Sequence, residues 1–576
     1  MESAIRDAPF GQLVRFLTNN KYFQYPEEKP GFKLPDTWLQ LLNPGDESKE
    51  KKIQDSNQRN EHGEPLSRAS TQASLPFTEA RLEADELHEV EKVQSIAIVP
   101  TKTKDGSILV DWYYTDDSEN PHNWSNRKRA LISTIICLYT FVVYTTSAIY
   151  TSSTEGVMKQ FGVSTLIASL GLSLYVLGYG IGPLIFSPLS EIPVIGRNPV
   201  YIVTMFLFVI ISIPTALVGN FPGLMVLRFL QGFFGSPCLA SGGASIGDMY
   251  SLISLPYAMM AWVSAAYCGP ALGPLLSGFA VPVKGWRWSL FISIWASAPV
   301  LILMFMFLPE TSSATILLRR ADRLRKIHGT NRFMSQSEID QRNMRVSAIA
   351  VDALIKPLEI TIKDPAVLFV QVYTAIIYGI YYSFFEVFPL VYPVDYGMNL
   401  GQIGLVFLCI MVSCIIGIAL YVGYLYFWMN PRIVRSGFPV QEARLIPALP
   451  ASFGPLIGLF IFAWTARPSV HWIAPTIGIT IYGATVFIVM QCIFVYIPLS
   501  YPRYAASLFA ANDFFRSALA CGSVLFAHPL FGNLGVARGV SLLGGLSVIG
   551  IVGIWLLYFY GSKLRALSKF ALSDQE

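Results

Sequence analysis

Several charged side chains lie inside apolar runs of this sequence. In a protein core or a bilayer, a charge without a partner is unstable. Asp513 and Arg516 lie well inside the apolar run 504–530. Ionisable residues at such depth are candidates for binding and moving protons or other ions. Their spacing of i and i+3 also allows a structural ion pair, which is the alternative. Asn512 shares a helical face with Arg516 and is a candidate contact for a bound molecule.

Arg228 is a second cation inside an apolar run, 222–246. Gln231 lies three residues further on the same helical face, and Gly232 leaves room for a neighbouring helix. A guanidinium that is always charged can control when a neighbouring carboxylate holds a proton. The alternative is an arginine whose head group reaches the outer membrane interface. Arg228 is therefore a candidate for proton coupling, and Gln231 is a candidate substrate contact.

An aromatic stripe follows one helical face of the seventh apolar run. Tyr378, Tyr382 and Glu386 are spaced by four residues, and Tyr381 and Phe385 form an adjoining row. Aromatic faces bind flat apolar or cationic molecules with little demand for an exact shape. Glu386 can then attract a cation or carry a proton. The alternative is an aromatic belt at the outer membrane interface.

Three charged residues suit a gate. Glu191 and Arg197 flank a turn rich in Gly and Pro, where they can pair with each other or with neighbouring helix ends. Asp248 closes a later apolar run and is a gate residue, a helix cap or a third carboxylate for the proton. Charged contacts that form in one state and break in another are a common switch. The alternative is a basic turn without a switching role.

Two Gly–Pro pairs lie four residues apart in the fifth apolar run. They are Gly269-Pro270 and Gly273-Pro274, and Gly278 follows them. Each proline removes a backbone hydrogen bond, so a kink is expected. Small residues allow a second helix to pack closely. A bent, closely packed helix between two halves would seal one side, whereas an ordinary proline kink is the alternative.

These residues have to be positioned by membrane-spanning helices. The chain is 53% hydrophobic and only 14% charged, whereas soluble proteins carry roughly 25% charged residues. Apolar runs long enough for the roughly 30 Å hydrocarbon core recur along the chain. We predict an all-α membrane protein with spans at 130–152, 166–189, 199–219, 222–246, 255–281, 287–309, 366–390, 402–426, 448–465, 472–499, 504–530 and 541–562.

Basic residues predict the orientation of these spans. They gather before the first span, after the sixth, after the eighth and in the tail, and positive residues collect on the cytoplasmic side of membrane proteins. Both termini are therefore expected inside. We predict a largely disordered cytoplasmic region at 1–125, six-helix bundles at 126–310 and 366–562, a basic cytoplasmic linker at 311–365 and a tail at 563–576.

The polar N-terminal region contains one amphipathic stretch. Phe10, Leu13, Val14 and Leu17 have helical spacing, which predicts a short helix that lies on the membrane or docks elsewhere.

Several of these segments resemble motifs of a known transporter family. The turn at Glu191, the run at Arg228 and the Gly–Pro run are similar, in order and position, to motifs A, B and C of the major facilitator superfamily. The Gly–Pro run resembles its drug:proton antiporter signature. Glu191 departs from the aspartate usual there, and Ile192-Pro193-Val194-Ile195 departs from the usual turn. The following segments resemble the twelve-span fungal multidrug branch: Phe10–Arg15, Leu308-Pro309-Glu310-Thr311, Leu317-Leu318-Arg319-Arg320, Phe384–Pro389, Glu442-Ala443-Arg444-Leu445 and Ala511–Ser517.

This resemblance implies the major facilitator fold, with spans one, four, seven and ten around a central cavity. It also implies proton-coupled export of hydrophobic or cationic molecules, such as drugs, fungicides or a fungal toxin, by alternating access. The expected partners are the lipid bilayer, small hydrophobic substrates and protons. We expect a monomer in the plasma membrane, or alternatively the vacuolar membrane, that uses no nucleic acid, metal or cofactor.

Other functions remain open at this point. A proton-coupled uptake permease for a nutrient would share the twelve spans, but it predicts a more polar cavity and no doubled Gly–Pro pattern. A membrane-embedded sensor or enzyme is a further alternative, although no histidine cluster or metal spacing lies near a membrane face. No phosphate-binding loop for ATP is visible, so the proton gradient is the expected source of energy.

Overall fold

The computed structural model describes residues 2–35, 38, 97–98, 100–103, 106–251, 253–341, 355, 358–436, 439–501 and 505–568. Within them, twelve helices are long and apolar enough to cross a membrane. This confirms the all-α membrane fold that the apolar runs predict. The ninth span, Ala448–Thr465, has the bounds expected from the sequence.

The first bundle begins at Asn126 and ends at Phe307. Its elements in chain order are α6 (Asn126–Ala148), η4 (Thr151–Ser153), α7 (Thr154–Phe161), α8 (Thr165–Ala168), α9 (Leu170–Glu191), α10 (Arg197–Leu217), α11 (Phe221–Gly235), α12 (Pro237–Gly247), α13 (Leu255–Lys284) and α14 (Trp288–Phe307).

The second bundle begins at Pro365. Its elements are α18 (Pro365–Tyr396), α19 (Leu400–Val406), α20 (Leu408–Tyr424), η5 (Leu425–Met429), α21 (Asn430–Ser436), η6 (Gln441–Leu445), α22 (Ala448–Ala451), α23 (Gly454–Thr465), α24 (Ile473–Ser500), α25 (Ala505–Leu534), α26 (Val536–Leu546) and α27 (Val548–Leu567).

Polar side chains set where several of these helices begin. The hydroxyl of Ser125 accepts a backbone N–H in the first turn of α6, and the carboxylate of Asp364 accepts two in the first turn of α18. Asn220 and Asn399 cap α11 and α19 in the same way. Such caps satisfy the N–H groups that a helix start leaves without a partner.

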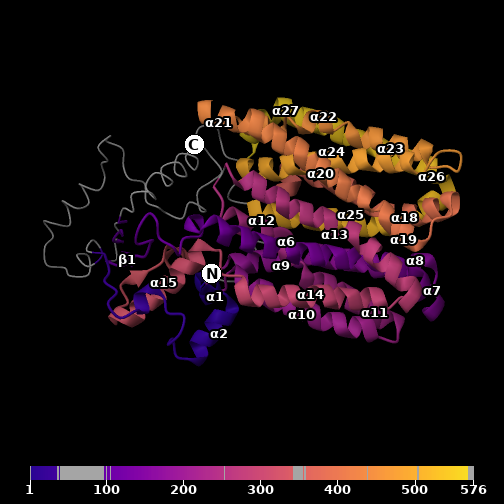
Figure 1. Ribbon diagram of the computed structural model, residues 1–576. Helices are drawn as coiled ribbons and strands as arrows, with labels where there is room; N and C mark the ends of the chain where they lie inside the picture. Colours follow the sequence, from indigo (N-terminus) through magenta and orange to yellow (C-terminus); the bar gives the residue numbers. More distant parts are fainter. Residues whose placement is uncertain are drawn as a thin grey trace.

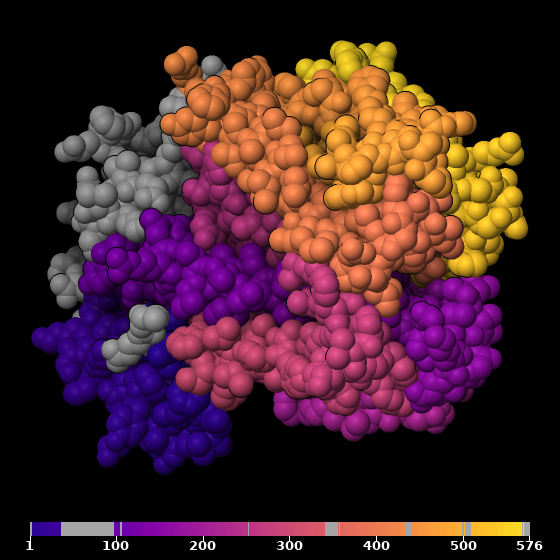
Figure 2. Space-filling model, turned by 45° about the vertical axis from the view of Figure 1, so that its right-hand side comes forward, coloured from indigo at the N-terminus to yellow at the C-terminus, as the bar shows by residue number. Residues whose placement is uncertain are grey.

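The two bundles lie side by side with their helices roughly parallel (Figure 1). Figure 2 shows the orange and yellow residues of the second bundle lying against the purple and pink residues of the first. One end of the molecule, the terminal end, carries the start of α6, the end of α27 and α15 (Ser313–His328). The opposite end, the loop end, carries α7, α19 and α26.

A folded unit, the terminal cap, covers the terminal end of the first bundle. It comprises the described residues 2–35, 38, 106–125 and 313–341, and it contains α1 (Glu2–Asp7), α2 (Pro9–Leu17), η1 (Pro26–Glu28), β1 (Ile108–Leu109), η3 (Pro121–Asn123), α15, β2 (Phe333–Met334) and α16 (Gln336–Gln341). β1 and β2 pair in parallel, with Ile108 opposite Phe333. Trp38, Ile108, Tyr113, Leu324 and Phe333 belong to a small core.

The terminal cap differs from the expected disordered region and linker. Its apolar core is shared between residues near the N-terminus and residues after α14, so neither segment alone contains enough apolar surface to show a fold in its composition. Most of residues 36–105, including the most polar run, lie outside the described residues.

Buried charges join the two parts of the terminal cap. Arg320 of α15 is fully buried, and its Nη1 lies 2.7 Å from Oδ2 of Asp117. Its Nη2 lies 3.1 Å from Oε2 of Glu119, and its Nε lies 3.3 Å from Oε1 of Glu27. Burial by itself would raise the pKa of Asp117, but the Arg320 guanidinium outweighs burial and lowers that pKa below its usual range.

The α13 helix carries the Gly–Pro run and is continuous from Leu255 to Lys284. A Cβ on Gly269 would lie 2.8 Å from the carbonyl oxygen of Phe141, and one on Gly273 would lie 2.8 Å from the amide nitrogen of Ile149. Real Cβ atoms do not approach a backbone so closely, so these glycines allow α13 to pack on α6.

Glycine also allows the two bundles to touch at the loop end. α13 packs against α19 of the second bundle. A Cβ on Gly278 would lie 2.5 Å from the carbonyl oxygen of Leu400, and one on Gly404 would lie 2.7 Å from Cα of Leu275. The Gly–Pro helix therefore forms part of the seam between the bundles.

Replacing Arg320 with glutamine should detach residues 2–35 from α15. The change leaves the buried carboxylate of Asp117 without its cation and leaves Glu27 and Glu119 with one cation fewer, which costs about 3 to 5 kcal/mol. Amide hydrogen exchange across residues 2–35 should therefore increase in the full-length protein. Arg325→Gln is the matched control on the same helix, because that side chain is 20% exposed and its ion pairs contribute about 1 kcal/mol or less. Equal exchange in the two variants would contradict the role of Arg320.

The same contact predicts how the terminal cap responds to acid. The pKa of Asp117 is lower in the folded cap than in an unfolded chain, so its stabilisation is complete above about pH 4 and is lost as the pH falls through the lowered value. Hydrogen exchange across residues 2–35 should stay low at neutral pH and increase only in strong acid. An increase between neutral pH and pH of about 5 would contradict this assignment.

Replacing Gly278 with alanine should weaken the seam between α13 and α19. The added methyl group clashes with the backbone of Leu400, and such overpacking typically costs about 1 to 3 kcal/mol. The thermal unfolding midpoint of the purified protein should fall. Gly522→Ala in α25 is the matched control, because no heavy atom lies within 4 Å of its Cβ position. An unchanged midpoint in Gly278→Ala would show that the seam tolerates a side chain.

Candidate functional site

A cavity lies between the two bundles. Helices α6, α12 and α13 of the first bundle and α18, α24 and α25 of the second line it. The family resemblance implies a cavity lined by spans one, four, seven and ten. In the structure, spans five and eleven line it as well. Most of the lining side chains are aromatic or aliphatic. Asp513 and Arg516 are the charged ones among the described lining residues.

The cavity lies toward the terminal end of the molecule. Phe494 stands near the end of α24 and Phe509 near the start of α25, and both helix ends belong to the terminal end. Trp262 lies near the start of α13, at the same end. The cavity therefore extends from the middle of α18, at Tyr378 and Tyr381, toward the terminal end.

Hydrogen bonds between the bundles close the loop end. Ser169 donates to Oε1 of Glu386 at 3.1 Å, and Ser173 donates to the carbonyl oxygen of Cys521 at 2.8 Å. Glu386 therefore belongs to this seal and does not line the cavity. Phe385 also lies outside the cavity wall, because it stacks on Phe407 with ring centroids 5.1 Å apart.

Asp513 and Arg516 form a buried ion pair within α25. Arg516 also donates to the hydroxyl of Tyr144 on α6 at 3.3 Å, and its guanidinium lies 4.6 Å from the ring centre of Tyr378. The second carboxylate oxygen of Asp513, Oδ2, is buried and has no hydrogen-bond partner among the described residues. The pair therefore contacts both bundles and lines the cavity. Oδ2 of Asp513 is an acceptor atom that can bind a proton.

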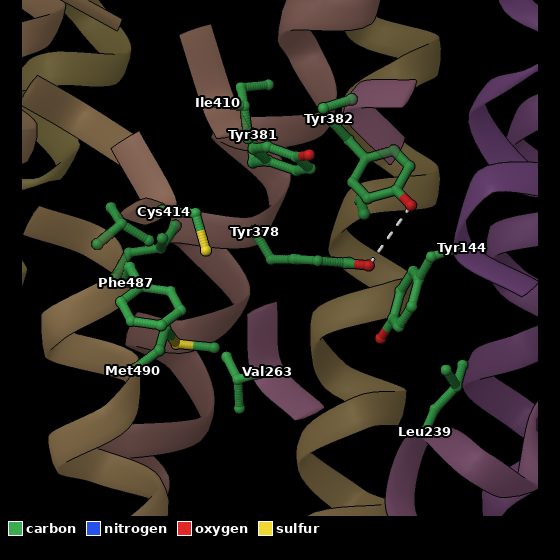
Figure 3. Close-up of a cluster of buried hydrophobic side chains, with 14 of the residues drawn as sticks. Tyr144, Leu239, Val263, Tyr378, Tyr381, Tyr382, Ile410, Cys414, Phe487 and Met490 are labelled. Atoms are coloured by element: carbon green, nitrogen blue, oxygen red, sulfur yellow. Dashed lines mark hydrogen bonds between the residues drawn. The ribbon is translucent and has the colours of Figure 1, made fainter. Parts of the chain in front are cut away.

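Three tyrosines meet between the bundles just beyond the ion pair. The hydroxyl of Tyr179 on α9 lies 2.7 Å from that of Tyr378 and 2.9 Å from that of Tyr382, both on α18. Tyr382 also lies 3.2 Å from the hydroxyl of Ser147 on α6. Figure 3 shows Tyr378 and Tyr382 joined by a further hydrogen bond, with Tyr144 facing them. Tyr378 lines the cavity, whereas Tyr382 lies behind it.

Two other predicted substrate contacts have different surroundings. Tyr381 lines the cavity, and its hydroxyl donates to the carbonyl oxygen of Tyr267 in the first bundle at 3.3 Å. Asn512 also lines the cavity, but its amide donates to Gln371 and Thr374 of α18, both at 2.7 Å. The Asn512 amide nitrogen is thus held by α18, which fixes α25 against it.

Arg228 is buried away from the cavity. Its guanidinium donates to the carbonyl oxygens of Gly171 at 2.9 Å, Thr146 at 3.1 Å and Ser147 at 3.1 Å. Gln231 accepts a further bond from Arg228 and donates to Ser212. Among the described residues, no carboxylate pairs with Arg228. In this arrangement Arg228 joins α6, α9 and α11, and neither Arg228 nor Gln231 lines the cavity.

The predicted gate residues lie at the terminal end of the first bundle. Arg197 pairs with Asp248, with Nη1 and Oδ2 2.7 Å apart. Glu191 is exposed and lies outside this pair. The ion pair between Arg197 and Asp248 therefore joins α10 to the end of α12 within one bundle. Arg197 pairs with Asp248 and not with Glu191.

Glu310 is a buried residue to which the sequence assigns no role. Its carboxylate accepts backbone N–H bonds from Arg197 and Asn198 at 3.2 Å and from Thr311 and Ser312 at 3.0 Å. It therefore caps the start of α10 and the turn before α15 together. An acidic residue directly after an apolar span and a proline is the signal that could have identified it.

The cavity also contains aromatic residues that the sequence does not distinguish from lipid-facing ones. Tyr144, Trp262, Tyr267, Phe494 and Phe509 all line it. They stand in spans that are apolar on every face, so their types and spacing do not separate a cavity wall from a lipid-facing surface.

Comparisons with known proteins agree with this architecture. The sequence matches the Major Facilitator Superfamily over residues 136–525. The MFS-type transporter pyvG of Aspergillus violaceofuscus is 47% identical over 82% of this chain and 87% of its own. The cycloheximide resistance protein of Candida maltosa is 35% identical over 99% and 100%, and fluconazole resistance protein 1 of Saccharomyces cerevisiae is 39% identical over 81% and 86%.

Solved structures share the fold at low sequence identity. The proton:xylose symporter XylE is similar with a TM-score of 0.53 at 14% identity, over 76% of this chain and 96% of that chain. The peptide transporter POT is similar with a TM-score of 0.53 at 14% identity, over 78% and 98%. Two packed bundles, twelve spans, a cavity between them and these sequence matches lead to one conclusion: this chain is a membrane transporter, not an enzyme, and it belongs to the major facilitator superfamily.

Proposed function

We propose that this protein exports hydrophobic or cationic small molecules in exchange for protons. The observation that carries the proposal is the cavity between the bundles, which is walled by aromatic residues and contains one buried carboxylate–guanidinium pair. Relatives named for resistance to cycloheximide and fluconazole support export of such compounds. The basic loops support a cytoplasmic terminal end, so the cavity lies toward the cytoplasmic side of the protein.

The aromatic wall accounts for the substrate class. Tyr378 and Tyr381 stack with their ring centroids 6.1 Å apart, and Tyr267 packs against Tyr381 at 5.9 Å. Faces of this kind bind flat and cationic molecules through stacking and ring electrostatics. A sugar or similar nutrient needs several hydrogen-bonding groups in the wall. The mostly aromatic lining therefore favours export of hydrophobic compounds over nutrient uptake.

Asp513 is the proposed proton carrier. In the inward-facing state its carboxylate is ionised and bound by Arg516, and the cavity accepts substrate from the cytoplasm. When the cavity opens outward, a proton on Asp513 weakens the ion pair and favours release of the substrate. Proton and substrate then favour opposite conformations, which is the requirement for exchange. One pH unit supplies about 1.4 kcal/mol per proton, enough for an approximately tenfold substrate gradient.

The remaining parts of the proposal follow from the architecture. Both bundles belong to one chain, so a monomer contains a complete cavity. The proton gradient supplies the energy, and no cofactor takes part. The plasma membrane is the proposed location, because export from the cell requires it. Glu386 belongs to the seal at the loop end, where it affects closure.

Replacing Asp513 with asparagine should abolish accumulation driven by a pH gradient. Inside-out vesicles with an acidic lumen should concentrate labelled fluconazole or cycloheximide when they contain the wild-type protein. The asparagine retains the shape of the side chain but does not titrate, so exchange of labelled for unlabelled substrate should continue without a gradient. Loss of both activities would indicate a structural ion pair, and wild-type accumulation by Asp513→Asn would refute the proposed proton carrier.

Replacing Tyr381 with alanine should narrow the range of exported compounds. The change removes an aromatic face from the cavity, which costs about 0.5 to 1.5 kcal/mol of binding for a stacked ligand, or roughly twofold to twelvefold. The inhibitory concentrations of aromatic compounds should fall by that factor in cells that depend on this transporter. Tyr381→Phe keeps the ring and should retain resistance, whereas equal loss in both variants would assign the effect to the hydroxyl.

A further inference from the structure

The α2 helix of the terminal cap presents an apolar face to solvent. Leu13 is 46% exposed, Phe16 is 79% exposed and Leu17 is 71% exposed, whereas Arg15 on the same helix is buried. A helix on the surface of a soluble domain has the reverse arrangement. The inward position of Arg15 is fixed, because its two terminal nitrogens each lie 2.7 Å from an oxygen of Glu28.

The position of α2 places this face next to lipid. α2 packs against α14, and the rings of Phe10 and Phe305 lie 6.3 Å apart. Only 28% of the apolar stretch of α14 is buried inside the protein, which is the smallest share among the twelve spans. Ile302, one turn from Phe305, is 62% exposed. The exposed face of α2 therefore continues the lipid-facing surface of α14 at its terminal end (Figure 1).

The charges around α2 are of one sign. Among residues 8–35, the exposed charged side chains are Lys21, Lys29 and Lys33. The carboxylates in the same stretch are occupied, since Glu27 is buried with Arg320 and Glu28 is bound by Arg15. An apolar helix face followed in the chain by exposed lysines suits the boundary between acyl chains and anionic head groups.

We propose that α2 is an interfacial helix that docks on the anionic lipid leaflet at the terminal end, with Leu13, Phe16 and Leu17 in the acyl boundary. The three lysines bind lipid phosphates and carboxylates. Because Arg320 and Arg323 tie the N-terminal segment to α15, the helix anchors the first bundle to the membrane surface. Among the described residues, α2 packs on α14 of the first bundle, so the second bundle moves relative to an anchored partner.

Lipid quenching of a fluorophore on α2 tests this proposal in the full-length protein. The label is attached at Phe16→Cys or Leu17→Cys, and labelled wild-type protein gives the background from native cysteines. The protein is placed in nanodiscs of phosphatidylcholine and phosphatidylserine with brominated acyl chains. Ile327→Cys on α15 is the matched control, because Ile327 is 46% exposed on the same cap. We expect several-fold stronger quenching at residues 16 and 17 than at residue 327.

The lysines are tested separately. A Lys21→Glu, Lys29→Glu, Lys33→Glu variant with the label at residue 16 should lose most of the quenching in discs that contain phosphatidylserine. Quenching at residues 16 and 17 no stronger than at residue 327 would overturn the proposal, as would cross-linking of two chains through residue 16. Equal quenching in discs of phosphatidylcholine alone would overturn the role of the lysines.

Discussion

A charge inside a membrane-spanning bundle must have a partner, and the structure meets this constraint in two ways. Arg228 gives its donors to backbone carbonyl oxygens of two neighbouring helices and to Gln231. Carbonyl oxygens do not titrate, so a proton does not break this contact, which joins helices. Arg516 is paired with Asp513 beside the cavity. A carboxylate can be neutralised, so this contact can be broken by a proton. The proposed transport cycle depends on that difference.

The terminal end of each bundle is also held by a buried carboxylate. In the first bundle the carboxylate of Glu310, after α14, accepts backbone N–H groups at the start of α10. In the second bundle Arg565, near the end of α27, pairs with Glu442 before α22. These contacts keep each bundle rigid while the seam between them changes. The cap adds a membrane contact to the first bundle alone, which makes it the stationary half of the proposed cycle.

The twelve spans could be predicted because hydrophobic length is a local property of the chain. The pairing of Asp513 with Arg516 was an open alternative for the same reason, since i and i+3 residues meet within one helix. The cavity wall was not predictable in full, because the spans are apolar on every face and Trp262 looks like any lipid-facing residue. The partners of Arg228 are backbone carbonyl oxygens, which every residue has, so residue types could not identify them. The terminal cap was missed because Arg320 and Asp117 are far apart in sequence.

Exchange of substrate for a proton at Asp513 can be measured as proton release upon substrate binding. Purified protein in weakly buffered solution with a pH indicator is mixed with cycloheximide or fluconazole, near the pH at which Asp513 is partly protonated. The wild-type protein should release protons as the ligand binds, and Asp513→Asn should bind the same ligand without release. Equal release by the two proteins, or binding by the wild-type protein with no release at any pH, would contradict exchange of substrate for a proton at Asp513.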